Sequence, residues 1–139
     1  MATRAAPRRV DCVGAILRSP DGRLLVIQRG QEPSAGQWSV PGGRVEPGET
    51  DAQALVREVR EETGLEVAVG DLVGVVEREG LGGAVYVIRD HACSLLGGHL
   101  AAATDAADAR WVTDDELREL TCVPGLVGEL EEWGVVDRR

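Results

Sequence analysis

The chain has 139 residues, of which 43% are hydrophobic, and it carries a formal net charge of −9. This length predicts a single domain with a hydrophobic core, and no apolar run approaches the length needed to span a membrane. The acidic balance argues against a surface that tracks nucleic acid, because such a surface needs clustered lysine and arginine.

The cysteines and the N-terminal residues indicate a protein of a reducing compartment. Cys12, Cys93 and Cys122 are odd in number and lack any CxxC spacing, which favours reduced, mostly buried thiols and a cytoplasmic location. Residues 1–9 carry arginines among alanines without the hydrophobic stretch of a signal peptide. We therefore expect these residues to form a flexible tail on a single domain that spans residues 1–139.

Two β-rich apolar runs begin the predicted order. We expect strands at residues 10–17 and 23–29, joined by the turn sequence SPDG at residues 19–22. A loop is expected at residues 29–36. A short extended piece at residues 38–40 then leads into a region of closely spaced prolines and glycines, for which we predict a turn-rich loop without regular structure.

A helix is predicted from Asp51 to Thr63. Thr50 lies three residues before Gln53, which is the capping-box spacing for a helix N-terminus. Gly64 suits the left-handed position that ends a helix, and Leu65 can then fold back onto the apolar side. The residues expected to form the apolar stripe are Ala52, Leu55, Val56 and Val59.

Short strands dominate the second half of the predicted order. They are expected at residues 66–69, 71–77, 84–89, 92–96 and 110–112. Glycines predict a turn at residues 80–83 and a hairpin at residues 97–98, and small residues predict a loop at 101–108. Thr113 begins a second capping box, and a last weak helix is expected at 126–133.

This order of strands, helix, strands and helix indicates one architecture. The chain has no internal repeat, no low-complexity segment and no linker that would divide it. We therefore predict an α/β fold in which helices cover both faces of a mixed β-sheet, that is, an α/β/α sandwich.

The predicted helix ends in a group of acidic residues. Glu58, Glu61 and Glu62 are related by i+3 and i+4, so we expect their carboxylates to be neighbours on the face opposite the apolar stripe. They lie where the helix dipole disfavours negative charge, and Arg57 and Arg60 offset only part of this conflict. A bound Mg²⁺ or Mn²⁺ would remove it, because hard cations prefer oxygen ligands. Taken alone, the same glutamates also suit a solvated acidic helix end.

A longer pattern surrounds these glutamates. Residues 43–65, GRVEPGETDAQALVREVREETGL, follow GX5EX7REUXEEXGU, where U is a bulky aliphatic residue. The fixed positions are Gly43, Glu49, Arg57, Glu58, Val59, Glu61, Glu62, Gly64 and Leu65. This is the signature of the Nudix hydrolases, and the chain strongly resembles that family. A match at so many fixed positions is far more specific than a lone glycine-rich loop.

The resemblance implies a role for each matching residue. Glu58, Glu61 and Glu62 would hold one or more divalent metal ions, with the carbonyl of Gly42 as a further oxygen ligand. Glu61 is the residue expected to orient or deprotonate the attacking water.

The same resemblance pairs Glu49 with Arg57, an interaction that would hold the helix in register. This pairing is physically sensible, because the planar fork of a guanidinium can fix a carboxylate in two directions.

Residues outside the signature are weaker candidates for contact with the substrate. Trp38, next to the glycine-rich loop, could stack on a nucleobase, and Arg29 is a further candidate. Glu77 and Glu79 follow a predicted strand and could supply an additional ligand or base. Trp111 lies in a short apolar strand, where a core position is the expected one.

The predicted reaction is the metal-assisted hydrolysis of a pyrophosphate bond in a nucleoside diphosphate linked to another group. The family markers for ADP-ribose, diadenosine polyphosphate and coenzyme A substrates are missing or displaced, so a nucleoside triphosphate, including an oxidised or non-standard one, is favoured. An ADP-ribose or other nucleotide-sugar pyrophosphatase is the alternative, and a non-catalytic nucleotide-sensing module is a more distant one. The sequence leaves open whether the chain forms a homodimer.

Overall fold

The computed structural model describes residues 6–101 and 106–138. In chain order its elements are β1 (Arg9–Leu17), β2 (Leu24–Arg29), β3 (Trp38–Ser39), β4 (Gly42–Arg44), α1 (Asp51–Thr63), β5 (Leu65–Glu79), the 3₁₀ turn η1 (Leu81–Gly83), β6 (Val85–Gly98), β7 (Ala106–Val112), α2 (Asp114–Glu119) and α3 (Leu126–Glu132). Residues 1–5 of the expected tail and residues 102–105 of the expected 101–108 loop lie outside the described residues. Arg9, expected to be part of the tail, begins β1 instead.

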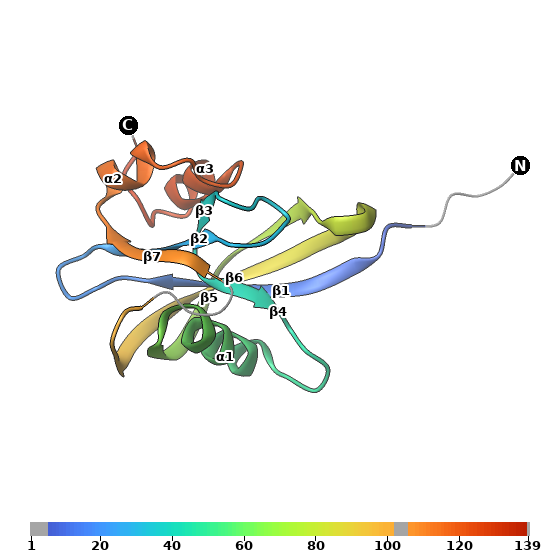
Figure 1. The fold of residues 1–139 in the computed structure, drawn as a ribbon, viewed down its shortest axis with the longest axis horizontal. Coiled ribbons are helices and arrows are strands. Elements are labelled where there is room, and N and C mark those ends of the chain that lie inside the picture. The colour runs from blue at the N-terminus through green and yellow to red at the C-terminus, as the bar shows by residue number, and fades with distance from the viewer. Residues whose placement is uncertain (1–5, 102–105, 139) are drawn as a thin grey trace, which may run out of the picture.

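The described strands form two sheets. The first is mixed and has the order β4-β1-β6-β5, in which β1 and β6 are parallel and the outer strands pair antiparallel. The second is antiparallel and has the order β3-β2-β7. Helix α1 lies on one side of the sheets, and α2 and α3 lie on the opposite side (Figure 1). The predicted α/β/α sandwich with a mixed sheet is confirmed, with a second sheet that the sequence did not indicate.

This second sheet arises where the first two strands separate. The predicted turn is present, and the N–H of Gly22 donates to the carbonyl of Ser19 at 2.9 Å. The strands meet at a bridge between Arg18 and Leu24, and then β1 enters the mixed sheet while β2 enters the antiparallel one. A turn motif specifies the local reversal of the chain, but it does not specify how far the two strands remain paired.

Helix α1 has the predicted bounds and the predicted caps. The hydroxyl of Thr50 accepts from the N–H of Gln53 at 3.1 Å, and Gly64 is left-handed with φ 75°. Leu55 and Val59 are fully buried in a core cluster with residues of β1, β2 and β5.

The buried face of α1 differs from the predicted stripe in one flank. Ala54 is buried, whereas Ala52 is exposed. The centre of the face is formed by Leu55, Val59 and Glu62, at the spacing i, i+4 and i+7. Glu62 is therefore on the buried side of the helix and not on the solvent side, where it was expected.

Strands β5 and β6 are each continuous, whereas a pair of shorter strands was expected in each region: 66–69 and 71–77 for β5, and 84–89 and 92–96 for β6. The register shifts between Val69 and Leu72 and again between Leu72 and Gly74, and such β-bulges absorb extra residues without ending a strand. The glycines at residues 97–98 pair with the start of β5 and do not form the predicted hairpin turn.

Two further differences concern short strands. A loop was expected at the residues of β4 because of their glycines. These residues instead pair with Cys12, Val13 and Gly14 of β1. Strand β7 begins at Ala106 rather than at residue 110, because β2 supplies a partner for its whole length. Both pairings join distant parts of the chain, so local residue patterns do not reveal them.

The C-terminal elements complete the second core cluster. The capping box of Thr113 and Glu116 is present at the start of α2, and Leu117 and Leu130 are fully buried. Over residues 6–101 and 106–138, every helix is too short or too polar to cross a membrane.

Candidate active site

The last two turns of α1 place its glutamates against β4. The carboxylate of Glu62 is buried, with 5% of the residue exposed, and it accepts a hydrogen bond from the N–H of Gly42 at 2.8 Å. Glu58 approaches the next residue: a Cβ at Gly43 would lie 2.5 Å from the carboxyl carbon of Glu58. The two glycines thus let the carboxylates of one helix contact the backbone of one strand.

Glycine is required in β4 for a second reason. A Cβ at Gly42 would lie 2.0 Å from the backbone oxygen of Val13 in β1, which is far closer than any real contact. The close approach fixes β4, and with it the position of the carboxylates, relative to the mixed sheet. This role of the glycines depends on the contact between β4 and β1, which the predicted turn-rich loop did not include.

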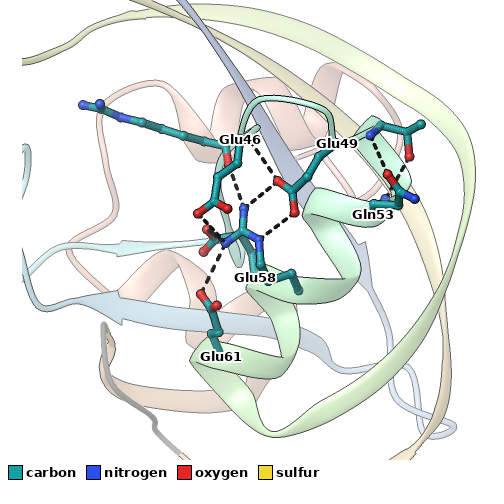
Figure 2. Close-up of polar contacts among 8 residues, drawn as sticks. Glu46, Glu49, Gln53, Glu58 and Glu61 are labelled. Carbon is teal, nitrogen blue, oxygen red and sulfur yellow. Dashed lines mark hydrogen bonds and ion pairs between the residues drawn. The ribbon is translucent and has the colours of Figure 1, made fainter.

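Arg57 joins the signature residues into one network (Figure 2). Its Nε and Nη2 donate to the two carboxylate oxygens of Glu49 at 2.8 and 2.9 Å. Nη2 also donates to the carbonyl of Arg44 at 3.1 Å, and Nη1 donates to Glu58 at 2.7 Å. The Arg57 guanidinium, together with the backbone N–H of Glu46, lowers the pKa of Glu49 to about 2. The structure therefore brings together Glu49 and Arg57 in the two-point pairing that the resemblance implied.

Glu61 is more exposed than the other two glutamates, and it shares Nη1 of Arg57 with Glu58. Its side chain is 45% exposed, and one carboxylate oxygen accepts from Nη1 of Arg57 at 3.4 Å. Among the described residues no group of three histidine, cysteine or acidic side chains is arranged to hold a metal ion. The expected three-glutamate cluster is thus not assembled in this structure, because Glu61 faces Arg57 and solvent while Glu62 faces the amide of Gly42.

The donor chemistry nevertheless fits a hard divalent cation. Glu58 and Glu62 both line one cleft together with Gly42 and Gly43. Carboxylate and backbone oxygens are the ligands that Mg²⁺ and Mn²⁺ prefer. Glu61 is on the adjacent turn of the same helix, with an exposed side chain that can change rotamer without disturbing the core.

The cleft has a volume of about 950 Å³ and is large enough for a nucleotide. Its floor is the face of the mixed sheet that carries Tyr86, Ile88 and Asp90. The walls come from the loop after β2 and from the segment that leads into α3. Strand β3 secures this second wall, since Trp38 exchanges backbone hydrogen bonds of 2.9 Å with residues 121 and 123.

The candidate substrate residues are divided between the cleft and the core. Arg29, Glu77 and Glu79 line the cleft. Trp38 is 6% exposed in the core cluster, and the guanidinium of Arg110 lies 4.8 Å from its ring centre. Trp111 packs partly buried against the other core cluster, in agreement with the position expected for it.

Tyr86 and Asp90 are two further residues that line the cleft. The hydroxyl of Tyr86 accepts from Arg44 at 2.7 Å, and the Arg44 guanidinium lies 5.2 Å from the ring centre. Asp90 is 3% exposed, and burial raises its pKa to about 7. The alternation of β6 places Tyr86 and Asp90 on one face, but an acid in the middle of a strand has no local signal that marks it as buried.

A helix with acidic side chains against a glycine strand, at the edge of a nucleotide-sized cleft, suits the hydrolysis of phosphoric anhydrides. A family model described as "NUDIX domain" matches residues 8–125. The chain belongs to the Nudix hydrolase family, and it is a pyrophosphohydrolase acting on nucleotide anhydride bonds.

Individual relatives are similar over most of their length. The CTP pyrophosphohydrolase of Escherichia coli K12 is 35% identical over 127 residues, which cover 91% of this chain and 92% of that protein. The protein named "Putative 8-oxo-dGTP diphosphatase 2" of Mycobacterium tuberculosis is 44% identical over 115 residues, covering 80% and 77%. The crystal structure of a MutT protein from Methanosarcina mazei Go1 superposes with a TM-score of 0.83 at 24% identity, covering 94% and 96% of the two chains, and so supports the fold.

Proposed function

We propose that the protein hydrolyses nucleoside triphosphates, including oxidised or non-standard ones, to a nucleoside monophosphate and pyrophosphate with the help of Mg²⁺ or Mn²⁺. The observation that carries this proposal is that Glu58 and Glu62 of one helix converge on Gly42 and Gly43 within a cleft of nucleotide size. The names of the relatives, which include "CTP pyrophosphohydrolase" and "Putative 8-oxo-dGTP diphosphatase 2", support the substrate class.

The acidic residues have distinct parts in this proposal. Glu58, Glu61, Glu62 and the Gly42 carbonyl would hold the cation, which when bound screens the phosphate oxygens and lowers the pKa of a bound water. Glu61 is the residue with an exposed carboxylate, and it is therefore the one placed to take a proton from the attacking water. Positioning and charge screening account for most of the catalysis of phosphoryl transfer, so no covalent intermediate is required.

Arg57 and Glu49 act by positioning other residues. The guanidinium spans Glu49, the carbonyl of Arg44 and Glu58, and it thereby fixes the loop between β4 and α1 to the helix. Because both members of the Glu49–Arg57 pair are only partly exposed, at 18% and 23% of their side chains, solvent competes less for these bonds than at an open surface. A reducing, cytoplasmic setting is part of the same proposal, since all three cysteines are free thiols.

Product analysis tests this function. The protein is incubated with Mg²⁺ and a panel containing CTP, dGTP, 8-oxo-dGTP and ADP-ribose, and the products are separated by anion exchange. We expect a nucleoside monophosphate and pyrophosphate from at least one triphosphate. Release of AMP and ribose 5-phosphate as the dominant reaction would instead identify a nucleotide-sugar pyrophosphatase, and no turnover of any nucleotide would overturn the proposal.

A variant connects the activity with the site. Glu62→Gln keeps an oxygen that accepts from Gly42, so the fold should remain, but the charge is lost and kcat/KM should fall by roughly two orders of magnitude or more. Glu132→Gln changes an exposed glutamate of α3 and is the matched control, with activity near that of the wild type. If Glu62→Gln retains full turnover, the role assigned to Glu62 is wrong.

A further inference from the structure

Apolar side chains form part of the lining of the cleft. Val76 of β5 is paired with Ile88 of β6 in the sheet register, and Val123 and Leu126 also line the cleft. Such a lining suits the faces of an aromatic ring. Asp90 is two residues beyond Ile88 on the same face of β6, and it brings a carboxyl group into this apolar region.

Asp90 has an unusual hydrogen-bonding state. Only 3% of the residue is exposed, and among the described residues Oδ1 has no hydrogen-bond partner. Its place is made by a glycine, because a Cβ at Gly14 would lie 1.9 Å from Oδ1. A buried polar atom without a partner costs free energy, so such an atom is a candidate for contact with a ligand, an ion or water.

The charged groups near Asp90 are engaged with other partners. Arg78 of β5 donates to Glu129 of α3 and to the carbonyl of Pro124, both at 2.5 Å. The ring of His91 approaches the carbonyl of Gly70 and the carboxylate of Asp51, at 3.3 and 3.4 Å. Neither basic residue is hydrogen bonded to Asp90, in keeping with the dominant effect of burial on its pKa.

The sheet register relates Asp90 to the proposed phosphate site. Gly42 of β4 is opposite Gly14 of β1, and Gly14 is opposite Asp90 of β6. Neighbouring strands are about 4.8 Å apart, so Asp90 is about 10 Å from the strand that the catalytic glutamates contact. This separation leaves room for a sugar between phosphates held near Gly42 and a base that reaches Asp90.

We propose that Asp90 determines base specificity, its Oδ1 accepting a hydrogen bond from the exocyclic amino group of a nucleobase that lies on the floor of the cleft. The inference rests on the proposed function for the presence of a nucleotide. It goes beyond that function by naming the residue and the chemical group of the base that are recognised. Bases that carry an amino group satisfy Oδ1, whereas bases without one leave it unpaired.

Matched nucleosides test this inference without phosphate or metal. Binding of cytidine is compared with that of 2-pyrimidinone riboside, and binding of adenosine with that of purine riboside, by NMR titration of ¹⁵N-labelled protein. In each pair the members differ by the amino group. We expect the wild type to bind the amino-bearing member of at least one pair about tenfold more tightly, with the amide signals of Gly14 and Asp90 among those that shift.

Two variants show which side chain is responsible. Asp90→Leu should abolish the preference within the pair, and Asp90→Asn, which retains an oxygen acceptor, should restore it. Asp71→Leu, at an exposed position of β5, is the matched control and should keep the wild-type preference. A preference that persists in Asp90→Leu, or no preference in the wild type, would overturn the inference.

Should Asp90→Leu not fold, the wild-type preference and the location of the shifted amides still decide the question. Nucleosides have no anhydride bond, so their binding is measured independently of hydrolysis. If the protein hydrolyses no nucleotide but still prefers the amino-bearing nucleosides, the proposed function is wrong and the role of Asp90 stands. If the protein releases pyrophosphate but binds nucleosides with and without the amino group equally, the role of Asp90 is wrong and the proposed function stands.

Discussion

At the scale of single residues, the charge of Arg57 is shared among several acceptors. A lysine in its place could keep the charge but not the two parallel bonds to Glu49, because an ammonium group has no planar fork. The interaction with Glu49 also explains why that carboxyl stays ionised far below its ordinary pKa.

We therefore predict that Arg57→Lys lowers kcat/KM by roughly tenfold or more, because the end of β4 at Arg44 and the loop that carries Glu49 lose their connection to α1. A double-mutant cycle with Glu49→Gln measures the coupling, which should be on the order of 0.5–3 kcal/mol. Additive effects of the two substitutions on kcat/KM would show that the pair does not act as a unit.

At the scale of secondary-structure elements, the contact between α1 and β4 creates the site. The glycines of β4 have different neighbours: a side chain at Gly42 would strike the backbone of Val13, whereas one at Gly43 would strike the flexible end of Glu58. Backbone cannot give way, but a carboxylate can rotate. The two positions should thus separate effects on folding from effects on catalysis.

We expect Gly42→Ala to disrupt the pairing of β4 with β1 and to destabilise the protein by about 2 kcal/mol or more. Gly43→Ala should change the melting temperature by only a few degrees while it displaces the carboxylate of Glu58 and lowers kcat/KM at least about tenfold. Thermal melts and steady-state kinetics on the same samples check both. A fully active Gly43→Ala protein would mean that the position of Glu58 is unimportant.

The element boundaries also show how far the sequence alone can predict the structure. Helix α1 was predicted residue for residue, because its capping box and its terminal glycine act within a few positions. Strand β5 was divided at Gly70, because a bulge and a turn use the same residue types and differ only in what the partner strand does.

The same distinction applies within the site. Glu49, Arg57 and Glu58 follow from a fixed spacing along one segment, and the structure brings them together. Burial of Glu62 depends on β4, and burial of Asp90, two strands away from Gly42, depends on Gly14 in the strand between them. Trp38 was considered for stacking from its neighbours in sequence, whereas the packing of α2, α3 and the antiparallel sheet places it in the core.

At the scale of the whole molecule, binding of a cation should be linked to stability. Only the folded chain brings Glu58 and Glu62 to the same strand, so a cation that binds them stabilises the native state alone. Glu62 is buried in the last turn of α1, where the helix dipole disfavours negative charge.

We predict that millimolar Mg²⁺ raises the melting temperature relative to chelator. At a hundredfold excess over Kd the gain is about 2.7 kcal/mol, or roughly 9 °C for a chain of 139 residues. NaCl at matched ionic strength is the control for screening, and Glu62→Gln should show a smaller shift. If wild-type curves in Mg²⁺ and chelator coincide, the scan is repeated with a non-hydrolysable nucleotide. Coincidence there as well would refute the metal site.

The parallel pairing of β1 with β6 has a consequence for folding kinetics. More than half of the chain separates the paired residues Arg9 and Val85. Forming this pairing therefore closes a long loop, and the intervening chain loses conformational entropy before the new contacts stabilise the structure. The β5–β6 hairpin and α1 are local and can form earlier. Because the cleft needs β1, β4 and β6 together, the ability to bind a nucleotide should appear only in the slowest step of folding.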